Sequence, residues 1–318
     1  KSSVNDIYDQ IIDDLTAAIN SGALPESYPD VDLGRVTVYA AEAILSDVYL
    51  TLEDYANASN TANDIISSGM FSLEPDMYKI FSADEVTHAG DIFSVKFARI
   101  DGLGTIMPNF LNNQQLGYSS AGWRVYLVNV EAPLIMNWDT IDIRHSLNLY
   151  DDDPNTPEGA VLTSAEPGLF KKYIDKDYVS GSGHGNDYAI YRYADVLTIY
   201  AEASAMDNNG PTDESYEALN KIRRRAYGVD IDTPNAEIDY SGLTLEEFRE
   251  AVWTERAYEF MMEGRRWYDM LRMSEDKAKQ IASDANLTLG DEDFLFPIPR
   301  QEIDNNDQIT EADQNPGY

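Results

Sequence analysis

Three glutamates spaced four residues apart could supply reactive carboxylates from one stretch of the chain: Glu255, Glu259 and Glu263. Two carboxylates can act as general acid and general base when they flank the bond that reacts. Residues four apart on a helix point the same way, so these side chains would leave a substrate no access between them. Arg256 lies three residues before Glu259, and aromatic residues surround the segment. We therefore predict partly buried ion pairs that fix helix packing, and no catalytic residues.

The remaining reactive side chains show no pattern typical of catalysis or of metal or cofactor binding. The chain has no cysteine, which excludes disulfides, thiol nucleophiles and cysteine-based zinc sites. The three histidines lack the spacing of metal ligands: His88, His145 and His184. Asp151, Asp153 and Asn155 alternate as in a calcium loop, but Thr156 stands where such a loop needs glycine, and the closing glutamate is missing. We predict an acidic surface loop there, no metal site and no cofactor.

The charge of the chain limits its partners. The sequence holds 57 Asp and Glu residues against 23 Lys and Arg, which gives a net charge of -34. So acidic a chain repels phosphate backbones and anionic lipid headgroups, and we predict no nucleic-acid partner. No apolar run approaches the ~18 residues that a membrane helix needs. We therefore expect any membrane attachment to come from outside the sequence itself.

Helical periodicity is strong at both ends of the chain. Apolar residues recur at spacings of three and four in segments that predict helices: 4–19, 36–52, 55–67, 189–206, 213–227 and 244–262. Residues 35–68 have the length of a tetratricopeptide unit, and their small alanines allow two helices to pack closely. One such unit cannot bury its own apolar face, so partner helices are required.

The middle of the chain, from about residue 75 to residue 185, has a different character. Gly, Pro, Asn and aromatic residues become frequent, and long loops on a rigid scaffold usually carry function. The alternation of Phe93, Val95 and Phe97 predicts a short strand. A helix is predicted at 127–138, interrupted early by Pro133.

Several segments resemble the SusD/RagB family when they are taken together. They are YRYADVL followed by YAEA within 191–203, ERAYEF and EGRRWYD within 255–269, FPIP at 296–299, and QNPGY at 314–318. These closing segments occur in the order that the family has them, and residues 4–68 look like its earlier helices. The resemblance covers the whole chain. Members usually also begin with a signal peptide, a lipidated cysteine and a further helical segment, and we expect that N-terminal part of the family to be absent here.

The resemblance implies a mainly α fold, a SusD-like α-helical repeat of tetratricopeptide-like helix pairs with a loop-rich insertion carrying short strands. We expect one SusD-like domain over 1–318. Within it, 1–74 would be a helical repeat part, 75–186 a loop-rich insertion for the ligand, and 187–318 the C-terminal helical repeats with an extended tail.

The resemblance also implies a function. We expect non-catalytic binding of a glycan at the cell surface and its delivery to a SusC-like TonB-dependent outer-membrane transporter. The protein would be a surface-exposed outer-membrane lipoprotein whose lipid anchor is not in this chain. The alternatives are a peptide-binding member of the same family, a helical-repeat scaffold that binds only protein, and a glycoside hydrolase.

In this family the loop-rich region contributes to the ligand site, with aromatic rings stacking on sugars and polar side chains contacting hydroxyls. The segment 109–126 is similar, and it implies these ligand-binding residues: Trp123, Tyr118, Tyr126, Arg124, Asn112 and Gln115. We expect Trp123 to be the main stacking surface, followed by Tyr118. The alternative for Trp123 is a place in the core, because Trp is highly buried on average.

Overall fold

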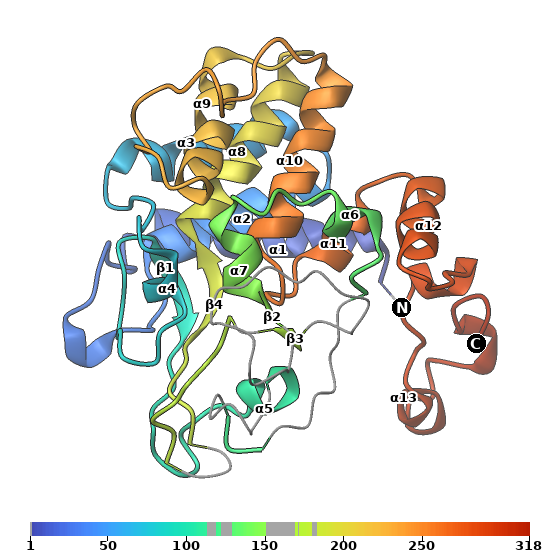
Figure 1. Ribbon diagram of the computed structural model, residues 1–318. Helices are drawn as coiled ribbons and strands as arrows, with labels where there is room; N and C mark the ends of the chain where they lie inside the picture. Colours follow the sequence, from blue (N-terminus) through green and yellow to red (C-terminus); the bar gives the residue numbers. More distant parts are fainter. Residues whose placement is uncertain (1, 113–118, 122–128, 151–168, 171, 180–182) are drawn as a thin grey trace.

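The computed structural model describes residues 2–112, 119–121, 129–150, 169–170, 172–179 and 183–318 (Figure 1). Over this part of the chain the fold is mainly helical, as the sequence predicts. Its helices are α1 (Val4–Asn20), η1 (Asp30–Asp32), α2 (Val38–Thr51), α3 (Tyr55–Ser68), α4 (Met77–Ile80), α5 (Met107–Leu111), α6 (Pro133–Met136), α7 (Ile143–Asn148), α8 (Tyr193–Asp207), α9 (Asp213–Ala226), α10 (Leu245–Glu259), α11 (Arg266–Leu271), α12 (Glu275–Asp284), η3 (Asp291–Phe294), α13 (Arg300–Asn305) and η4 (Glu311–Asp313). Its strands are β1 (Asp91–Val95), β2 (Leu149–Tyr150), β3 (Leu169–Phe170) and β4 (Tyr188–Arg192). None of the helices in these residues is long and apolar enough to span a membrane.

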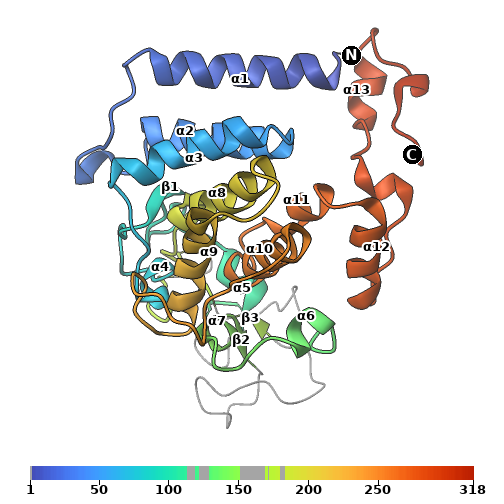
Figure 2. The same cartoon turned by 90° about the horizontal axis from the view of Figure 1, so that it is seen from above.

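The main hydrophobic core is shared by α2, α3, α8, α9 and α10. Figure 2 shows α1, then α2 with α3, then α8 as successive levels of this stack. Alanines with no exposed surface lie in the core that α2, α3 and α8 share: Ala43, Ala58, Ala62, Ala201 and Ala203. Small side chains let helix axes approach closely, because axis separation depends on the side chains at the contact. The alanine-rich pattern therefore sets the packing of the helix pairs that it predicts.

The ends of these helices follow local sequence signals. Ser3 and Asp6 form a capping box at the start of α1, and Thr244 and Glu247 form another at the start of α10. Such a box satisfies two backbone N–H groups that the first turn leaves unpaired. Gly69 ends α3 in the left-handed region, at φ 67°, which glycine adopts without steric cost. Local hydrogen bonding and backbone geometry therefore set where these helices begin and end.

The start of α8 differs from the helix predicted at 189–206. Residues 188–192 form β4, which pairs antiparallel with β1 so that Asp91 lies opposite Arg192 and Val95 opposite Tyr188. The backbone N–H of Arg192 donates to Asp195 Oδ2 at 2.9 Å, and the helix begins immediately afterwards. Pairing with a strand almost 100 residues earlier thus overrides local helical periodicity.

The other predictions for the loop-rich part are met in part. The strand predicted at 93–97 appears as β1, two residues earlier. Of the helix predicted at 127–138, the structure has the single turn α6, which starts at Pro133 because proline is favoured in the first turn of a helix.

The tail is held together by its two motifs. The side-chain amide of Gln314 both accepts from Ile298 N–H at 2.7 Å and donates to Ile298 C=O at 3.0 Å. Asn315 Nδ2 donates to Phe296 C=O at 2.6 Å. The FPIP and QNPGY segments are therefore two halves of one hydrogen-bonded unit, which lies beside α12 and α13 in Figure 2.

Candidate functional site

The glutamates predicted to form ion pairs lie in the core. Glu255 and Glu259 have 0% of their surface exposed and Glu263 has 3%. Arg192 Nη1 and Arg225 Nη2 donate to Glu259 Oε1 at 2.7 Å and 2.6 Å. Their burial is more complete than the partial burial that the sequence predicts. The ion-pair interpretation of this motif is confirmed, but the partner of Arg256 differs from the one that the sequence suggests, because its Nε donates to Asp269 Oδ1 at 2.9 Å.

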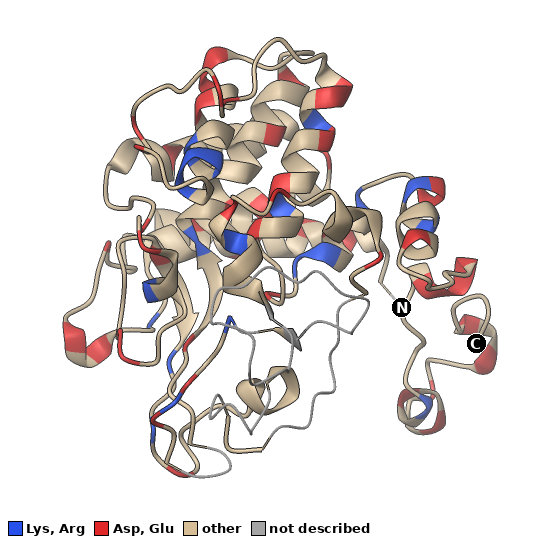
Figure 3. Cartoon of the chain, in the orientation of Figure 1, with Lys and Arg blue, Asp and Glu red and all other residues tan. Residues whose placement is uncertain are grey.

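The same network reaches into the loop-rich part of the chain. Arg144 Nη2, on α7, donates to Glu255 Oε2 at 2.6 Å and to Asp142 Oδ2 at 2.6 Å. Lys172 Nζ donates to Glu263 Oε1 at 2.7 Å. These bonds join segments 91 to 111 residues apart. They attach the insertion to α10 and to the turn that follows it, where Figure 3 shows acidic and basic segments side by side.

Charge compensation fixes the protonation of these groups. Burial alone would raise the pKa of Glu259, but the positive charges of Arg225, Arg192 and Arg144 outweigh burial and hold that pKa well below its ordinary value. A carboxylate held ionised in this way has no proton to donate as a general acid at neutral pH. The arrangement suits a structural role.

The residues predicted to bind ligand are mostly beyond what the structure describes. Those outside the described residues are Gln115, Tyr118, Trp123, Arg124 and Tyr126. Asn112 is described: it follows α5 and has 0% of its surface exposed. Their roles in ligand binding stay predictions. The described flanks of the segment, 109–112 and 119–121, show how it is attached to the fold.

A buried asparagine joins the two flanks. Asn109 Oδ1 accepts from Ser120 Oγ at 3.0 Å and from the backbone N–H of Ala121 at 2.9 Å. His184 Nε2 lies 3.3 Å from Asn109 Oδ1 and accepts from Ser120 N–H at 3.3 Å. The carbonyl of His184 also accepts from Thr105 N–H at 2.9 Å. The residues on either side of 110–119 are therefore held together by Asn109. Sequence spacing gives no sign of this contact, because Asn109 and His184 are 75 residues apart.

We expect Asn109→Ala to lower the free energy of unfolding by about 1–3 kcal/mol, because it removes the acceptor of two partly buried donors. The amide of Ala121 should also exchange its hydrogen faster. Urea unfolding and hydrogen exchange measure the two effects. Asn137→Ala, at an exposed position after α6, is the matched control and should change stability by less than about 0.5 kcal/mol. Equal effects of the two variants would contradict the role of Asn109.

A large groove beside the helical layer offers little exposed aromatic surface to a sugar. It has a volume of about 700 Å³ and lies between α6, α10 and α12. Its walls combine aliphatic residues such as Leu134, Met261 and Ile281 with charged residues such as Arg266 and Lys277. Trp253 and Tyr258 also line it, but each is only 8% exposed. Rings buried this deeply present little face to a ligand.

The fold and the buried ion pairs define a class of protein: an α-helical repeat protein with an inserted loop region held on the repeat by charge pairs. The model of the SusD family matches residues 55–318 of this chain. The chain belongs to the SusD family.

Relatives and solved structures agree with this family. SusD-like protein P2 of Formosa agariphila is 26% identical, over 100% of this chain and 66% of its own length. SusD-like protein P25 of the same organism is 23% identical, over 93% of this chain and 62% of its own length. The chain therefore spans a little under two thirds of the length of these curated relatives.

Three solved structures share the fold. A SusD superfamily protein from Parabacteroides distasonis has a TM-score of 0.77 at 24% identity, covering 100% of this chain and 70% of that one. Surface glycan-binding protein A from Bacteroides uniformis has a TM-score of 0.75 at 22% identity, covering 98% and 69%. A laminarin binding SusD-like protein has a TM-score of 0.76 at 21% identity, covering 100% and 70%. Likeness at this level of identity establishes the fold.

Proposed function

We propose that this protein binds a glycan at the cell surface without cleaving it. The observation that carries the proposal is membership of the SusD family, together with the shared fold of proteins named for binding glycans or laminarin. The segment 109–126 adds the appropriate chemistry, because aromatic faces stack on sugar rings and amides bond to hydroxyls. Trp123 is the proposed stacking surface, with Tyr118, Tyr126, Arg124, Asn112 and Gln115 around it.

The proposed role is capture and transfer. The glycan would pass to a SusC-like TonB-dependent transporter, with the protein attached to the outer membrane as a surface-exposed lipoprotein. The absence of turnover is supported by the motif of Glu255 and Glu259, whose carboxylates form buried ion pairs. Membership of the family supports both the partner and the location.

A glycan array followed by calorimetry of the best glycan tests the proposal. Trp123→Ala should raise the Kd at least tenfold, about 1.4 kcal/mol, with an unchanged circular dichroism spectrum. Trp267→Ala is the matched control, since this half-buried Trp packs on Phe294 in another part of the fold. Its affinity should stay within about twofold of the wild type. No released product should appear on long incubation.

Other outcomes point to the alternatives. If Trp123→Ala unfolds the protein and the folded fraction still binds, Trp123 belongs to the core. Binding of peptides and of no glycan would favour a peptide-binding member of the family. Binding of neither, with stable association to another protein, would favour a scaffold. Release of shorter glycans would contradict the non-catalytic role.

A further inference from the structure

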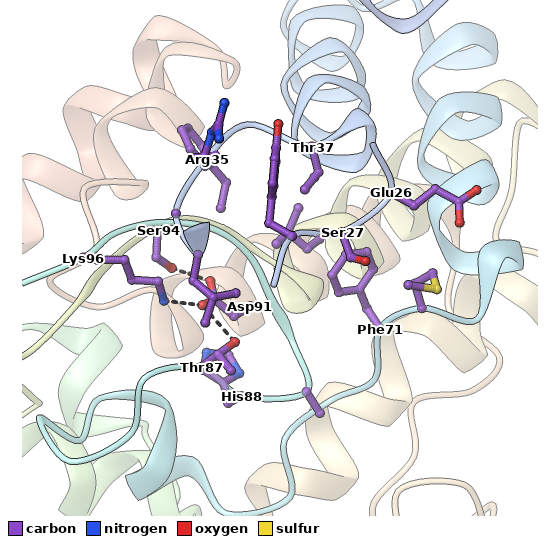
Figure 4. Close-up of a pocket in the computed structure, with 17 residues that line it drawn as sticks. Glu26, Ser27, Arg35, Thr37, Phe71, Thr87, His88, Asp91, Ser94 and Lys96 are labelled. Atoms are coloured by element: carbon purple, nitrogen blue, oxygen red, sulfur yellow. Dashed lines mark hydrogen bonds and ion pairs between the residues drawn. The ribbon is translucent and has the colours of Figure 1, made fainter. Parts of the chain in front are cut away.

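A second, smaller pocket lies where three segments far apart in the sequence meet. The loop before α2 contributes Tyr28 and Arg35, the chain after α3 contributes Met70 and Phe71, and the segment from Thr87 through β1 closes the pocket (Figure 4). Its volume is about 240 Å³. Its described lining includes no residue of 109–112 or 119–121, so it is separate from the described flanks of the proposed glycan segment.

The floor of this pocket is a fixed polar cluster centred on Asp91. Lys96 Nζ and Ser94 Oγ each donate to Asp91 at 2.5 Å, and Thr87 Oγ1 donates at 3.3 Å. Figure 4 shows these side chains converging on the carboxylate. Lys96 is held from the other side by Asp187 at 2.9 Å. The floor is therefore preorganised, and a ligand would not need to order it.

Two half-buried aromatic rings form the walls. Phe71 is fixed by an edge contact with Tyr39, with ring centroids 5.4 Å apart, and by stacking on Tyr193 at 6.5 Å. Tyr28 lies under the guanidinium of Arg35, which is 4.9 Å from the ring centroid. A held ring offers apolar contact area at low entropic cost.

The charges of the lining balance. Its charged residues are two acids and two bases: Glu26, Asp91, Arg35 and Lys96. Burial lowers the pKa of His88, so its ring is neutral at physiological pH, and its Nδ1 accepts from Gly90 N–H at 3.1 Å. Ser27 and Thr37 also line this pocket. Balanced charge, hydroxyls and aromatic walls favour a neutral ligand with both polar and apolar faces over an anion or a cation.

The volume limits the ligand to one ring, since pockets for drug-sized ligands span about 300–1,000 Å³. We propose that the pocket formed by Tyr28, Phe71 and the Asp91–Lys96 pair binds a single neutral sugar ring, at a site separate from the 109–126 segment. The choice of a sugar rests on the proposed function. The location of the site does not.

Methyl NMR of methionine tests this site directly, because Met70 lines the pocket. Its signal can be assigned with Met70→Leu. Met273, in the groove between α6, α10 and α12, serves as the internal reference. Titration with glucose, galactose and mannose should shift the Met70 signal for at least one sugar and leave Met273 unchanged. Glucuronate and glucosamine should bind at least tenfold more weakly than that sugar.

Two aromatic variants complete the test. Tyr28→Ala should raise the Kd of the Met70 response at least tenfold, whereas Tyr268→Ala, at an exposed position on α11, should leave it unchanged. A Met70 response that survives Trp123→Ala supports a separate site, even if the glycan array finds no ligand for the 109–126 segment. The inference is overturned if no neutral sugar shifts Met70, if a charged sugar binds as tightly, if Tyr28→Ala has no effect, or if Trp123→Ala abolishes the response.

Discussion

Replacing Glu259 with alanine is expected to lower the free energy of unfolding by about 3–5 kcal/mol. Glu259 has no exposed surface and accepts from Arg192 and Arg225, with Arg144 Nη1 3.6 Å from its second oxygen. Removing the carboxylate takes away the one that Arg225 contacts, whereas Arg192 keeps Glu263 and Arg144 keeps Asp142 and Glu255. Stability of a whole domain is only about 5–15 kcal/mol, so this loss is a large fraction of the total. Urea unfolding followed by circular dichroism measures the change.

Two further variants separate charge from packing. Glu259→Gln keeps the side-chain volume and removes the charge, so we expect it to cost nearly as much as alanine. Glu246→Ala, at an exposed position in the first turn of the same helix, should cost less than about 1 kcal/mol. A Glu259→Gln variant that loses less than about 1 kcal/mol would show that the network does not stabilise through charge.

We expect acid to unfold the protein by protonating the carboxylates of this network. Burial would raise the pKa of Glu255, Glu259, Glu263 and Asp269, but neighbouring arginines and Lys172 outweigh burial and hold each pKa below its ordinary value. A carboxyl with a lowered pKa in the folded state stabilises the fold above its unfolded pKa, about 4.5 for Glu and 3.8 for Asp. That stability is lost as the pH falls through the folded pKa. We expect a steep loss of stability below pH 4.5.

Glu42 acts in the opposite sense, and burial also raises the pKa of Asp187 and Asp195. Burial, and to a smaller extent the charge of Asp64, raises the pKa of Glu42 to about 7. A group with a raised pKa gives its full stability below the unfolded value of 4.5 and loses it as the pH rises through about 7. Stability should therefore rise slightly between pH 7 and pH 5 before the acid loss begins. Urea titrations at pH 3, 4, 5, 7 and 8 measure the profile, and a stability that stays flat from pH 5 to pH 3 would contradict the prediction.

The helices of this protein could be predicted because their signals act over a few residues. Ser3 and Thr244 accept hydrogen bonds from the first turn of the helix next to them, and Gly69 ends the helix before it. The alanine stripes of α2, α3 and α8 indicate close packing, but they do not identify the partner helix. β4 was missed for the complementary reason. Its aromatic residues fit a helical stripe equally well, and only the presence of β1 alongside decides for a strand.

The candidate site, too, could be predicted from the sequence only in part. The charge pattern of α10 predicts buried ion pairs, but the partners Arg144 and Lys172 come from segments 111 and 91 residues away, which spacing cannot identify. The same holds for the contact of Asn109 with His184, and for the pocket of Tyr28, Phe71 and Asp91. The residues of 109–126 are a prediction from family resemblance.

The sequence by itself determined the helix pairs, their caps, the family and the structural role of the glutamates on α10. These follow from periodicity, from short-range hydrogen bonding and from motifs read along the chain. The tertiary structure decided which cations neutralise those glutamates, how Asn109 is joined to Ser120 and Ala121, and that three distant segments enclose a small neutral pocket. Burial and pairing depend on the path of the whole chain, because a buried charge is stabilised by whatever group the fold places within about 3 Å of it.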